Sequence, residues 1–361
     1  MRLLIDARSL GQKPSGIGMY IYNFAKELNK IKECEIALIT DVAYSDEIKE
    51  LNANGIQLLE YGKEIKKTFS LFSYYRFVQK CILSYRPDIF WEGNNLFLTK
   101  IVNPYGRVIT TIYDVFPVTE PNCYGKIYPY YFKYGLQHTI KNVDEIIYIS
   151  KETKNEVEQY FPLAKTKNSY ISYIIINGNK MSSIERQDYY LYIGNLEKRK
   201  GTDILLRAYE EYRKQGGNKK LVIAGKMRET SIKELYDRIC GKVDGIEYRG
   251  YVNSEEKEEL MSNCYAFVFP SRAEGFGMPV IEAMFYKKEI IVSDLNIFDE
   301  IAGNDVIKFD LDISDDIAIR NLSKTLLDSE KDENQICYDE VIERFSAEKL
   351  VKDLWSHFTM E

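Results

Sequence analysis

Two glutamates flank a glycine loop in the stretch "PSRAEGFGMPVIEAM" (270–284), which directly follows an apolar run. Glu274 precedes Gly275-Phe276-Gly277, a loop whose backbone can lie close against a sugar because glycine carries no side chain. Glu282 stands about one turn inside the helix expected to begin near Pro279, where its carboxylate can accept hydrogen bonds from two ribose hydroxyls. The pattern is suited to a ligand that presents several hydroxyl groups.

The start of this helix is also suited to an anion. Proline is tolerated in the first turn of a helix, because the N–H that it lacks has no partner there. The N–H groups of Gly277 and Met278 then face outward, toward a phosphate. The alternative is that Glu282 only complements the helix dipole and that Glu274 is an ordinary surface-loop residue.

A second stretch, "YIGNLEKRKGTDILL" (192–206), places two cations just before an expected helix. An apolar strand ends at Gly194-Asn195, and Arg199 and Lys200 follow. Cations oppose the dipole at a helix N-terminus, so these two need a compensating anion unless they point into solvent. A diphosphate would be such an anion. The alternative is a solvated basic turn.

The loop after the first expected strand contains "SGIG" (15–18) at a helix start. Gly16 and Gly18 would let the backbone approach a ligand, and the free N–H groups of the helix start favour an anion. The alternative is a plain helix start capped by Ser15. The third glycine of a dinucleotide fingerprint and the Gly-Lys-Ser/Thr of a Walker loop are both missing.

Two further loops follow expected strands, "AGKMRE" (224–229) and "YRGYVNSEE" (248–256). Backbone groups of Tyr251 and Val252 could contact the edge of a base. The alternative is a pair of ordinary turns, with Ser254 as the N-cap of a helix whose first turn is acidic.

The elements that must position these loops alternate between short apolar runs and amphipathic segments. This alternation, with buried strands, is typical of parallel sheets covered on both faces, where ligands bind beyond the carboxyl ends of the strands. The expected strands are 3–6, 35–40, 56–59, 88–91, 107–113, 145–149, 189–194, 220–225, 246–250, 265–270, 289–294 and 306–310. The expected helices include 18–30, 69–85, 126–141, 151–160, 202–214, 232–240 and 255–262, with a helical tail over 315–357.

The pattern runs twice, so we expect two α/β domains. The polar stretch 177–188 is the best linker candidate. We therefore predict an N-terminal domain over 1–176 and a C-terminal domain over 189–335, followed by a C-terminal helix within 336–361.

Composition excludes several classes of protein. A length of 361 residues suits two domains, and 45% hydrophobic with 29% charged residues argues against disorder. The net charge of −6 argues against a nucleic-acid binder. Two histidines, and six cysteines without C-x-x-C spacing, make a zinc site improbable. Neither a signal peptide nor an apolar run of membrane-spanning length is present, so we expect a cytoplasmic protein.

Together these motifs resemble the retaining nucleotide-sugar glycosyltransferases of family four, which share the GT-B fold. The stretch 271–284 resembles the E-x7-E motif of that family, and the similarity extends over nearly the whole chain through 15–28, 110–121, 145–161 and 192–209. The resemblance implies two Rossmann-like, doubly wound domains facing across a cleft. It also implies that the C-terminal domain holds the donor and that the last helix returns to the first domain.

The resemblance also implies roles for individual residues. Glu282 would bind the donor ribose and Glu274 the hydroxyls of the transferred sugar. Lys200 would hold the diphosphate with Arg199 as helper. The remaining residues implied to touch the donor are Gly16, Gly18, Gly194, Asn195, Tyr251, Val252, Gly275, Phe276, Gly277 and Met278, and those implied on the acceptor side are Tyr113 and Asp114.

The chain departs from the family pattern at three positions. Asn195 stands where arginine is common, Tyr113 where histidine is common, and Met19 where arginine is common. A histidine-based step is therefore not expected. The leaving diphosphate can be stabilised by Lys200, Arg199 and helix N–H groups, and it can itself take the acceptor proton. We expect no cofactor and no essential metal, with a GDP- or UDP-sugar as co-substrate.

Two segments, 63–86 and 124–141, combine aromatic rings with lysines, which suits a lipid headgroup interface. The family often uses lipid-linked acceptors, so a saccharide or lipid-linked acceptor at the inner membrane face is one hypothesis. Core aromatics beside solvated lysines are the alternative.

The preferred reading is a hexosyltransferase of cell-surface glycan synthesis. Two alternatives stay open: a sugar-nucleotide epimerase of the same fold, and a catalytically impaired nucleotide-sugar-binding protein. Neither they nor the preferred reading involves nucleic acid.

Overall fold

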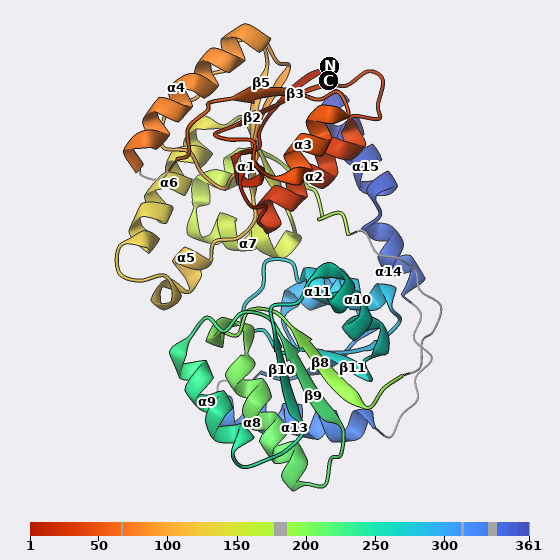
Figure 1. The fold of residues 1–361 in the computed structure, drawn as a ribbon. Coiled ribbons are helices and arrows are strands. Elements are labelled where there is room, and N and C mark those ends of the chain that lie inside the picture. The colour runs from red at the N-terminus through yellow and green to blue at the C-terminus, as the bar shows by residue number, and fades with distance from the viewer. Residues whose placement is uncertain (66–67, 177–185, 312–313, 331–337, 361) are drawn as a thin grey trace. The chain divides into compact units, whose positions relative to one another are not determined.

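In the computed structural model, residues 1–65, 68–176, 186–311, 314–330 and 338–360 are described, and the chain forms two compact units (Figure 1). The first comprises Met1–Ile175 with Phe345–Glu361, and the second Ile176–Arg344. Each unit contains one parallel sheet covered by helices, which confirms the predicted α/β class. Most of the predicted linker, residues 177–185 of 177–188, lies outside the described residues.

The sheet of the first unit has the order β3-β2-β1-β4-β5-β6-β7, and all its strand pairs are parallel. The chain runs outward from β1 to β3, then returns to add β4 on the other side of β1. The strand order therefore reverses between β1 and β4. The strands are β1 (Arg2–Asp6), β2 (Glu35–Thr40), β3 (Gln57–Glu60), β4 (Ile89–Glu92), β5 (Arg107–Ile112), β6 (Glu145–Tyr148) and β7 (Asn168–Ile171).

Helices cover both faces of this sheet (Figure 1). α2 packs against α3 and against the C-terminal α15, while α4 and α6 lie on the other face. The helices of this unit are α1 (Arg8–Gly11), α2 (Gly16–Leu28), α3 (Asp46–Ala53), α4 (Thr68–Tyr85), α5 (Phe116–Thr119), α6 (Tyr128–Asn142), α7 (Lys151–Tyr160) and α15 (Ala347–Thr359). Short 3-10 turns cover Pro121–Cys123 and Pro162–Thr166.

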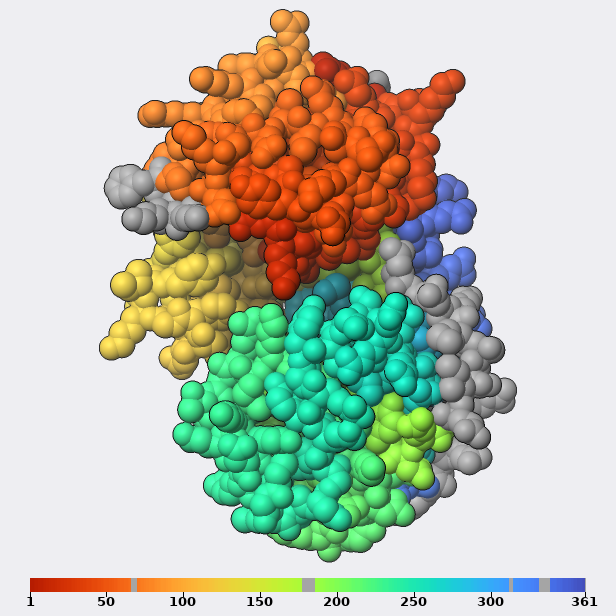
Figure 2. Space-filling model, in the orientation of Figure 1, coloured from red at the N-terminus to blue at the C-terminus, as the bar shows by residue number. Residues whose placement is uncertain are grey.

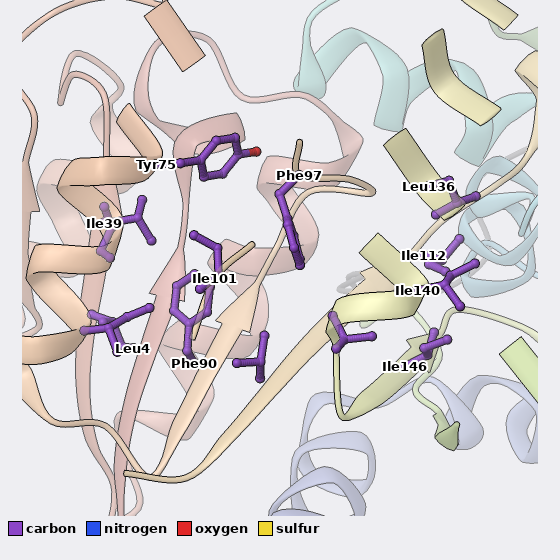
Figure 3. Close-up of a cluster of buried hydrophobic side chains, with 14 of the residues drawn as sticks. Leu4, Ile39, Tyr75, Phe90, Phe97, Ile101, Ile112, Leu136, Ile140 and Ile146 are labelled. Carbon is purple, nitrogen blue, oxygen red and sulfur yellow. The ribbon is translucent and has the colours of Figure 1, made fainter. Parts of the chain in front are cut away.

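One large buried cluster of the first unit lies between its sheet and the helices α4 and α6 (Figure 3). The cluster contains Leu4 of β1 and Phe90 of β4 together with Tyr75 of α4 and Phe97 of the loop after β4. Leu136 and Ile140 of α6 extend the same cluster. Burying these large side chains removes much apolar surface from water, which is the main force that holds the strand ends in place.

The sheet of the second unit has the order β10-β9-β8-β11-β12-β13 and is also parallel. Its strand order reverses between β8 and β11. The strands are β8 (Tyr189–Ile193), β9 (Lys220–Ala224), β10 (Ile246–Gly250), β11 (Ala266–Phe269), β12 (Glu289–Ser293) and β13 (Ile307–Phe309).

Helices also lie on both faces of the second sheet, with α8 and α9 on one side and α10 and α11 on the other (Figure 1). α13 packs against α8. The helical elements are η3 (Lys198–Lys200), α8 (Thr202–Lys214), α9 (Thr230–Cys240), α10 (Ser254–Asn263), α11 (Met278–Phe285), α12 (Asn296–Ala302), α13 (Asp315–Ser329) and α14 (Asp339–Arg344).

Two details of these helices differ from the sequence-based expectations. Ser254 is not the N-cap of α10, because it is the first residue of the helix; the cap is Asn253, whose side chain accepts a hydrogen bond from the Glu256 N–H at 2.9 Å. The helical tail is not one unit either. It divides into α13 and α14 in the second unit and α15 in the first.

Within the part of the chain that the structure describes, no helix combines the length and the apolar character that crossing a membrane requires.

Candidate functional site

The reversal of strand order in the second unit brings the two main predicted motifs together. β8 leads into the turn that contains Arg199 and Lys200, and β11 leads into the loop that contains Glu274. These strands are direct neighbours, with Ala266 paired to Tyr190. Ligands of open α/β sheets bind beyond the carboxyl ends of the strands at such a reversal. The fold therefore places the predicted phosphate and sugar residues at one edge of one sheet.

Glu274 and Lys200 form an ion pair at this edge. The Glu274 Oε2 atom accepts a hydrogen bond from Lys200 Nζ and another from Ser271 Oγ at 3.2 Å. Arg199 Nη1 lies 3.9 Å from the same oxygen, and its Nη2 donates to Glu197 at 2.8 Å. The two cationic side chains are only 14–15% exposed, which rules out the alternative of a solvated basic turn.

A second set of contacts ties the turn 198–200 to the loop 271–274. The Arg272 N–H donates to the Arg199 carbonyl at 2.8 Å, and Arg199 Nη1 donates back to the Ala273 carbonyl at 3.0 Å. The Arg272 guanidinium donates to both carboxylate oxygens of Asp203, at 2.6 and 3.0 Å, and so reaches the first turn of α8. The two segments are thereby held as one cross-linked element, which sequence spacing did not reveal.

A glycine is required where these segments touch. Gly201 has φ +65°, and a Cβ atom there would lie 1.8 Å from the Pro270 carbonyl oxygen. Gly277, directly before α11, has φ +88° and acts as its left-handed cap. With Gly277 in this conformation, α11 begins at Met278 with Pro279 in its first turn, as the sequence predicted.

Glu282 lies on α11 as predicted and forms an ion pair with α10. Its Oε2 atom is 2.6 Å from Lys257 Nζ, and the Glu282 side chain is about one-quarter exposed. Although it lies beside Lys257, the buried Oε2 atom accepts no hydrogen bond within the described residues, so it can accept one from a ligand hydroxyl. Gly275 and Phe276, which link Glu274 to Gly277 and α11, are both buried.

The other predicted donor residues follow β8 and β10. The Gly194 carbonyl closely approaches the backbone at Gly225, where an added Cβ atom would lie only 1.8 Å from that oxygen. Asn195 is exposed, and its carbonyl accepts a hydrogen bond from Tyr192 at 2.8 Å. Tyr251 is exposed beneath Lys226, whereas Val252 is buried.

In the first unit, the glycine loop lies after β1, at the reversal of its sheet. Ser15 caps α2 by accepting a hydrogen bond from the Gly18 N–H at 3.3 Å, so that N–H is already occupied. A Cβ atom at Gly18 would lie 2.4 Å from the Ser9 carbonyl oxygen, which shows that packing against α1 requires this glycine. Gly16, by contrast, is exposed.

Tyr113 and Asp114 follow β5. The Tyr113 side chain is buried, and its hydroxyl donates to the Gly93 carbonyl at 3.0 Å. Burial raises the pKa of Tyr113 well above its usual value, so this phenol does not serve as a base near neutral pH. The Asp114 carboxylate accepts a hydrogen bond from the Phe116 N–H at 3.2 Å. An acceptor-side role for the pair stays a prediction.

A buried charged cluster at the ends of β1 and β4 escaped the sequence-based analysis. Arg8 Nη2 lies 3.8 Å from Asp6 and 3.7 Å from Glu92, and both carboxylates are fully buried. Arg8 also donates to the Tyr75 hydroxyl, and Asp6 accepts from the Tyr74 hydroxyl at 2.8 Å. Burial, reinforced by the Asp6 carboxylate, raises the pKa of Glu92 well above its usual value.

This cluster leads to a prediction about stability. Arg8→Met should lower the free energy of unfolding by about 3–5 kcal/mol, because it leaves buried carboxylate charge without its cation. Arg2→Met is the matched control: Arg2 pairs with Glu35 on the surface, and losing such a pair costs at most about 1 kcal/mol. Urea unfolding followed by tryptophan fluorescence measures both, since Trp91 and Trp355 lie in the first unit. Equal losses in the two variants would contradict the prediction.

One cavity of about 480 Å³ lies away from these residues. It is found at the amino ends of β8, β9 and β10, the opposite edge of the sheet from the ion pair of Lys200 and Glu274. Its lining mixes both charge signs, as in Lys220 and Glu247, and includes none of the predicted site residues. We therefore assign the candidate site to the carboxyl ends of β8 and β11 and not to this cavity.

The sequence is similar to a glycosyltransferase family model and to two known glycosyltransferases. Residues 177–339 match the family model described as "Glycosyl transferases group 1". The chain is 22% identical over 308 residues to O-antigen chain mannosyltransferase RfbU of Salmonella typhimurium, covering 84% of this chain and 86% of that one. It is 25% identical over 329 residues to O-antigen chain mannosyltransferase B of Escherichia coli, covering 84% and 85%.

Solved structures match in fold over the full length. HepE of Anabaena, crystallised with UDP and glucose, has a TM-score of 0.71 at 14% identity, with 99% of both chains covered. WaaG, a glycosyltransferase involved in lipopolysaccharide biosynthesis, also has a TM-score of 0.71 at 14% identity, with 100% of both chains covered. These neighbours confirm the predicted GT-B fold.

Proposed function

We propose that the chain is a group 1 glycosyltransferase that moves a hexose from a nucleotide-diphosphate sugar to a saccharide acceptor with retention of configuration. The observation that carries this proposal is the meeting of Lys200, Arg199 and Glu274 at the reversal point of the second sheet. Cations suited to a diphosphate and a carboxylate suited to sugar hydroxyls lie side by side there.

In the proposed reaction, the bond between the sugar C1 atom and the diphosphate oxygen breaks while the acceptor oxygen bonds to C1 from the same face. The acceptor proton passes to an oxygen of the departing phosphate. Lys200, Arg199 and the N–H groups at the start of α11 stabilise the negative charge that develops on the diphosphate. In this proposal the protein itself supplies the compensating positive charge, so the reaction needs no metal ion, no cofactor and no histidine.

The proposed donor contacts follow the geometry of the second unit. Glu282 accepts hydrogen bonds from the ribose, and Glu274 accepts them from the transferred sugar. Gly194 and Asn195 lie beside the phosphates, and the backbone of Tyr251 and Val252 lies beside the base. The proposed sugar is mannose, because the two relatives that match 84% of this chain are O-antigen chain mannosyltransferases.

A thermal-shift screen with UDP, GDP and ADP tests donor binding. A ligand that binds only the folded chain raises its melting temperature, and the rise grows with the ratio of concentration to Kd. We expect a clear rise with UDP or GDP at millimolar concentration. Absence of any rise with all three nucleotides would contradict the proposed donor class.

We also propose that the acceptor is lipid-linked and that the first unit meets the membrane surface through α6. Ile127, Tyr130 and Tyr134 are 68–81% exposed, and their spacing of three and four residues places them on one helical face. Lys126 and Lys133 are exposed beside them. This segment stands at the surface in yellow (Figure 2). Aromatic rings with lysines favour an anionic headgroup interface.

In the other aromatic-basic segment, 63–86, Phe72 and Leu83 are exposed while Tyr74, Tyr75 and Val78 are core residues. Lys66 and Lys67 lie outside the described residues. Some aromatic residues of this segment therefore belong to the core and others could face a membrane. The exposed aromatic residues of α6 are the stronger evidence for membrane binding.

The membrane proposal predicts that the chain binds vesicles containing anionic lipid at low salt and dissociates as salt is raised. The double variant Tyr130→Ser/Tyr134→Ser should bind at least several-fold more weakly in a co-sedimentation assay. Tyr44→Ser is the matched control, because Tyr44 is equally an exposed tyrosine but lies elsewhere in the first unit. Wild-type chain that stays in the supernatant at low salt would refute the proposal.

A further inference from the structure

The Lys200–Glu274 ion pair joins two groups to which the proposed function gives different ligands. Lys200 is assigned to the diphosphate and Glu274 to the transferred sugar, yet the two contact each other directly. The Glu274 carboxylate is therefore the anion that neutralises Lys200 in this structure, in the role that the proposal gives to the diphosphate. The diphosphate of an entering donor competes with this carboxylate for Lys200.

This competition has consequences for Glu274, whose side chain is only 11% exposed. Within the described part of the chain, Lys200 and Arg199 are the cations that lie within 4 Å of its carboxylate. Arg199 is already bound to Glu197 and to the Ala273 carbonyl. When a diphosphate takes Lys200, the Ser271 hydroxyl is the closest remaining hydrogen-bond donor to Glu274. A poorly solvated carboxylate that loses its cation needs other donors.

The backbone cannot relieve this situation by moving the two segments apart. Arg272 fixes the turn 198–200 through its N–H to the Arg199 carbonyl and through its guanidinium to the Lys198 carbonyl at 2.6 Å. The same guanidinium is anchored on Asp203 and, at 2.9 Å, on Asp315. The exchange of partners therefore takes place between side chains, while the loop and the turn stay in place.

We propose that Glu274 determines specificity by making the site favour the intact nucleotide-sugar over the free nucleoside diphosphate. Both ligands draw Lys200 toward phosphate, but only the nucleotide-sugar brings hydroxyl groups that donate to the released carboxylate. A bound nucleoside diphosphate brings no such hydroxyl groups and leaves that carboxylate with the Ser271 hydroxyl as its closest donor. It is therefore the weaker ligand, which favours product release. This inference rests on the proposed function and adds to it a role for the pair itself.

Calorimetric titration of UDP, GDP, UDP-glucose and GDP-mannose tests the inference. Glu274→Gln keeps the shape of the side chain but removes the charge that competes for Lys200. We expect this variant to bind the nucleoside diphosphate on the order of tenfold more tightly than the wild type, which corresponds to one charged hydrogen bond. Its preference for the nucleotide-sugar over the diphosphate should fall by at least the same factor.

Glu282→Gln is the matched control, since it removes one negative charge from the neighbouring ribose site. It should lower the affinity for the nucleoside diphosphate and for the nucleotide-sugar by similar factors and leave the ratio of the two affinities unchanged. Glu274→Asp keeps the negative charge but shortens the side chain by one methylene. It should change the ratio of the two affinities in the same direction as Glu274→Gln, but by a smaller factor. It also provides a second measurement if the glutamine variant folds poorly.

The outcomes separate the two levels of the proposal. A wild-type chain that binds and transfers sugar, combined with a Glu274→Gln variant whose affinity for the diphosphate is unchanged or weaker, would overturn the inference alone. A wild-type chain that binds none of the four ligands would overturn the proposed function and the inference with it.

Discussion

Replacing Lys200 with alanine should lower kcat/KM for sugar transfer by roughly 30- to 1,000-fold, equivalent to about 2–4 kcal/mol of transition-state stabilisation. Lys200 is a poorly exposed cation next to the sugar-side carboxylate, at the carboxyl end of β8. Charge develops on the diphosphate as it leaves, so the loss should fall mainly on kcat. Steady-state kinetics with the donor selected by thermal shift provides the measurement.

Lys198→Ala is the matched control for this variant. Lys198 belongs to the same 3-10 turn, but its side chain is exposed. Removing it takes away one positive charge at nearly the same place in the sequence without touching the ion pair with Glu274. Similar losses in the two variants would mean that general positive charge, and not the position of Lys200, supports the reaction.

The second large effect concerns the backbone that positions Lys200. Gly201→Ala should destabilise the second unit and lower activity, because the new Cβ atom would lie 1.8 Å from the Pro270 carbonyl oxygen. The turn would have to move away from the loop 271–274 and carry Lys200 with it. We expect this overlap to cost about 1–3 kcal/mol beyond the cost of a positive φ for alanine.

Gly216→Ala separates the two contributions. Gly216 also has positive φ, but nothing lies within 4 Å of a Cβ atom placed there. This variant should show only the conformational cost and should keep its activity. Chemical unfolding followed by circular dichroism, together with donor turnover, measures both variants. Equal stability of the two would contradict the close contact between the turn and the loop.

The sequence predicted the bounds of individual strands and helices best, because these depend mainly on neighbouring residues. The apolar runs located all the strands of the second sheet to within one or two residues, and α7 and α8 have the predicted bounds, 151–160 and 202–214. Periodicity and turn residues suffice there because each element depends mainly on its own side chains. The cap of α10 was misplaced by one residue because Asn253 and Ser254 are both good caps.

Contacts between segments that lie far apart in the sequence could not be predicted from the sequence. Arg8 and Glu92 meet because β1 and β4 become neighbours, which depends on the order of strands and not on spacing along the chain. Arg272 reaches Asp203 for the same reason, through β11 and β8. The E-x7-E stretch located Glu274, but its partnership with Lys200 required the sheet order.

The most direct test of the central claim is an NMR time course of the wild-type chain with UDP-glucose or GDP-mannose and a saccharide acceptor. We expect free nucleoside diphosphate to appear together with a new glycosidic bond whose anomeric configuration equals that of the donor. An isomerised donor, an inverted product, or a donor that binds without being consumed would contradict it.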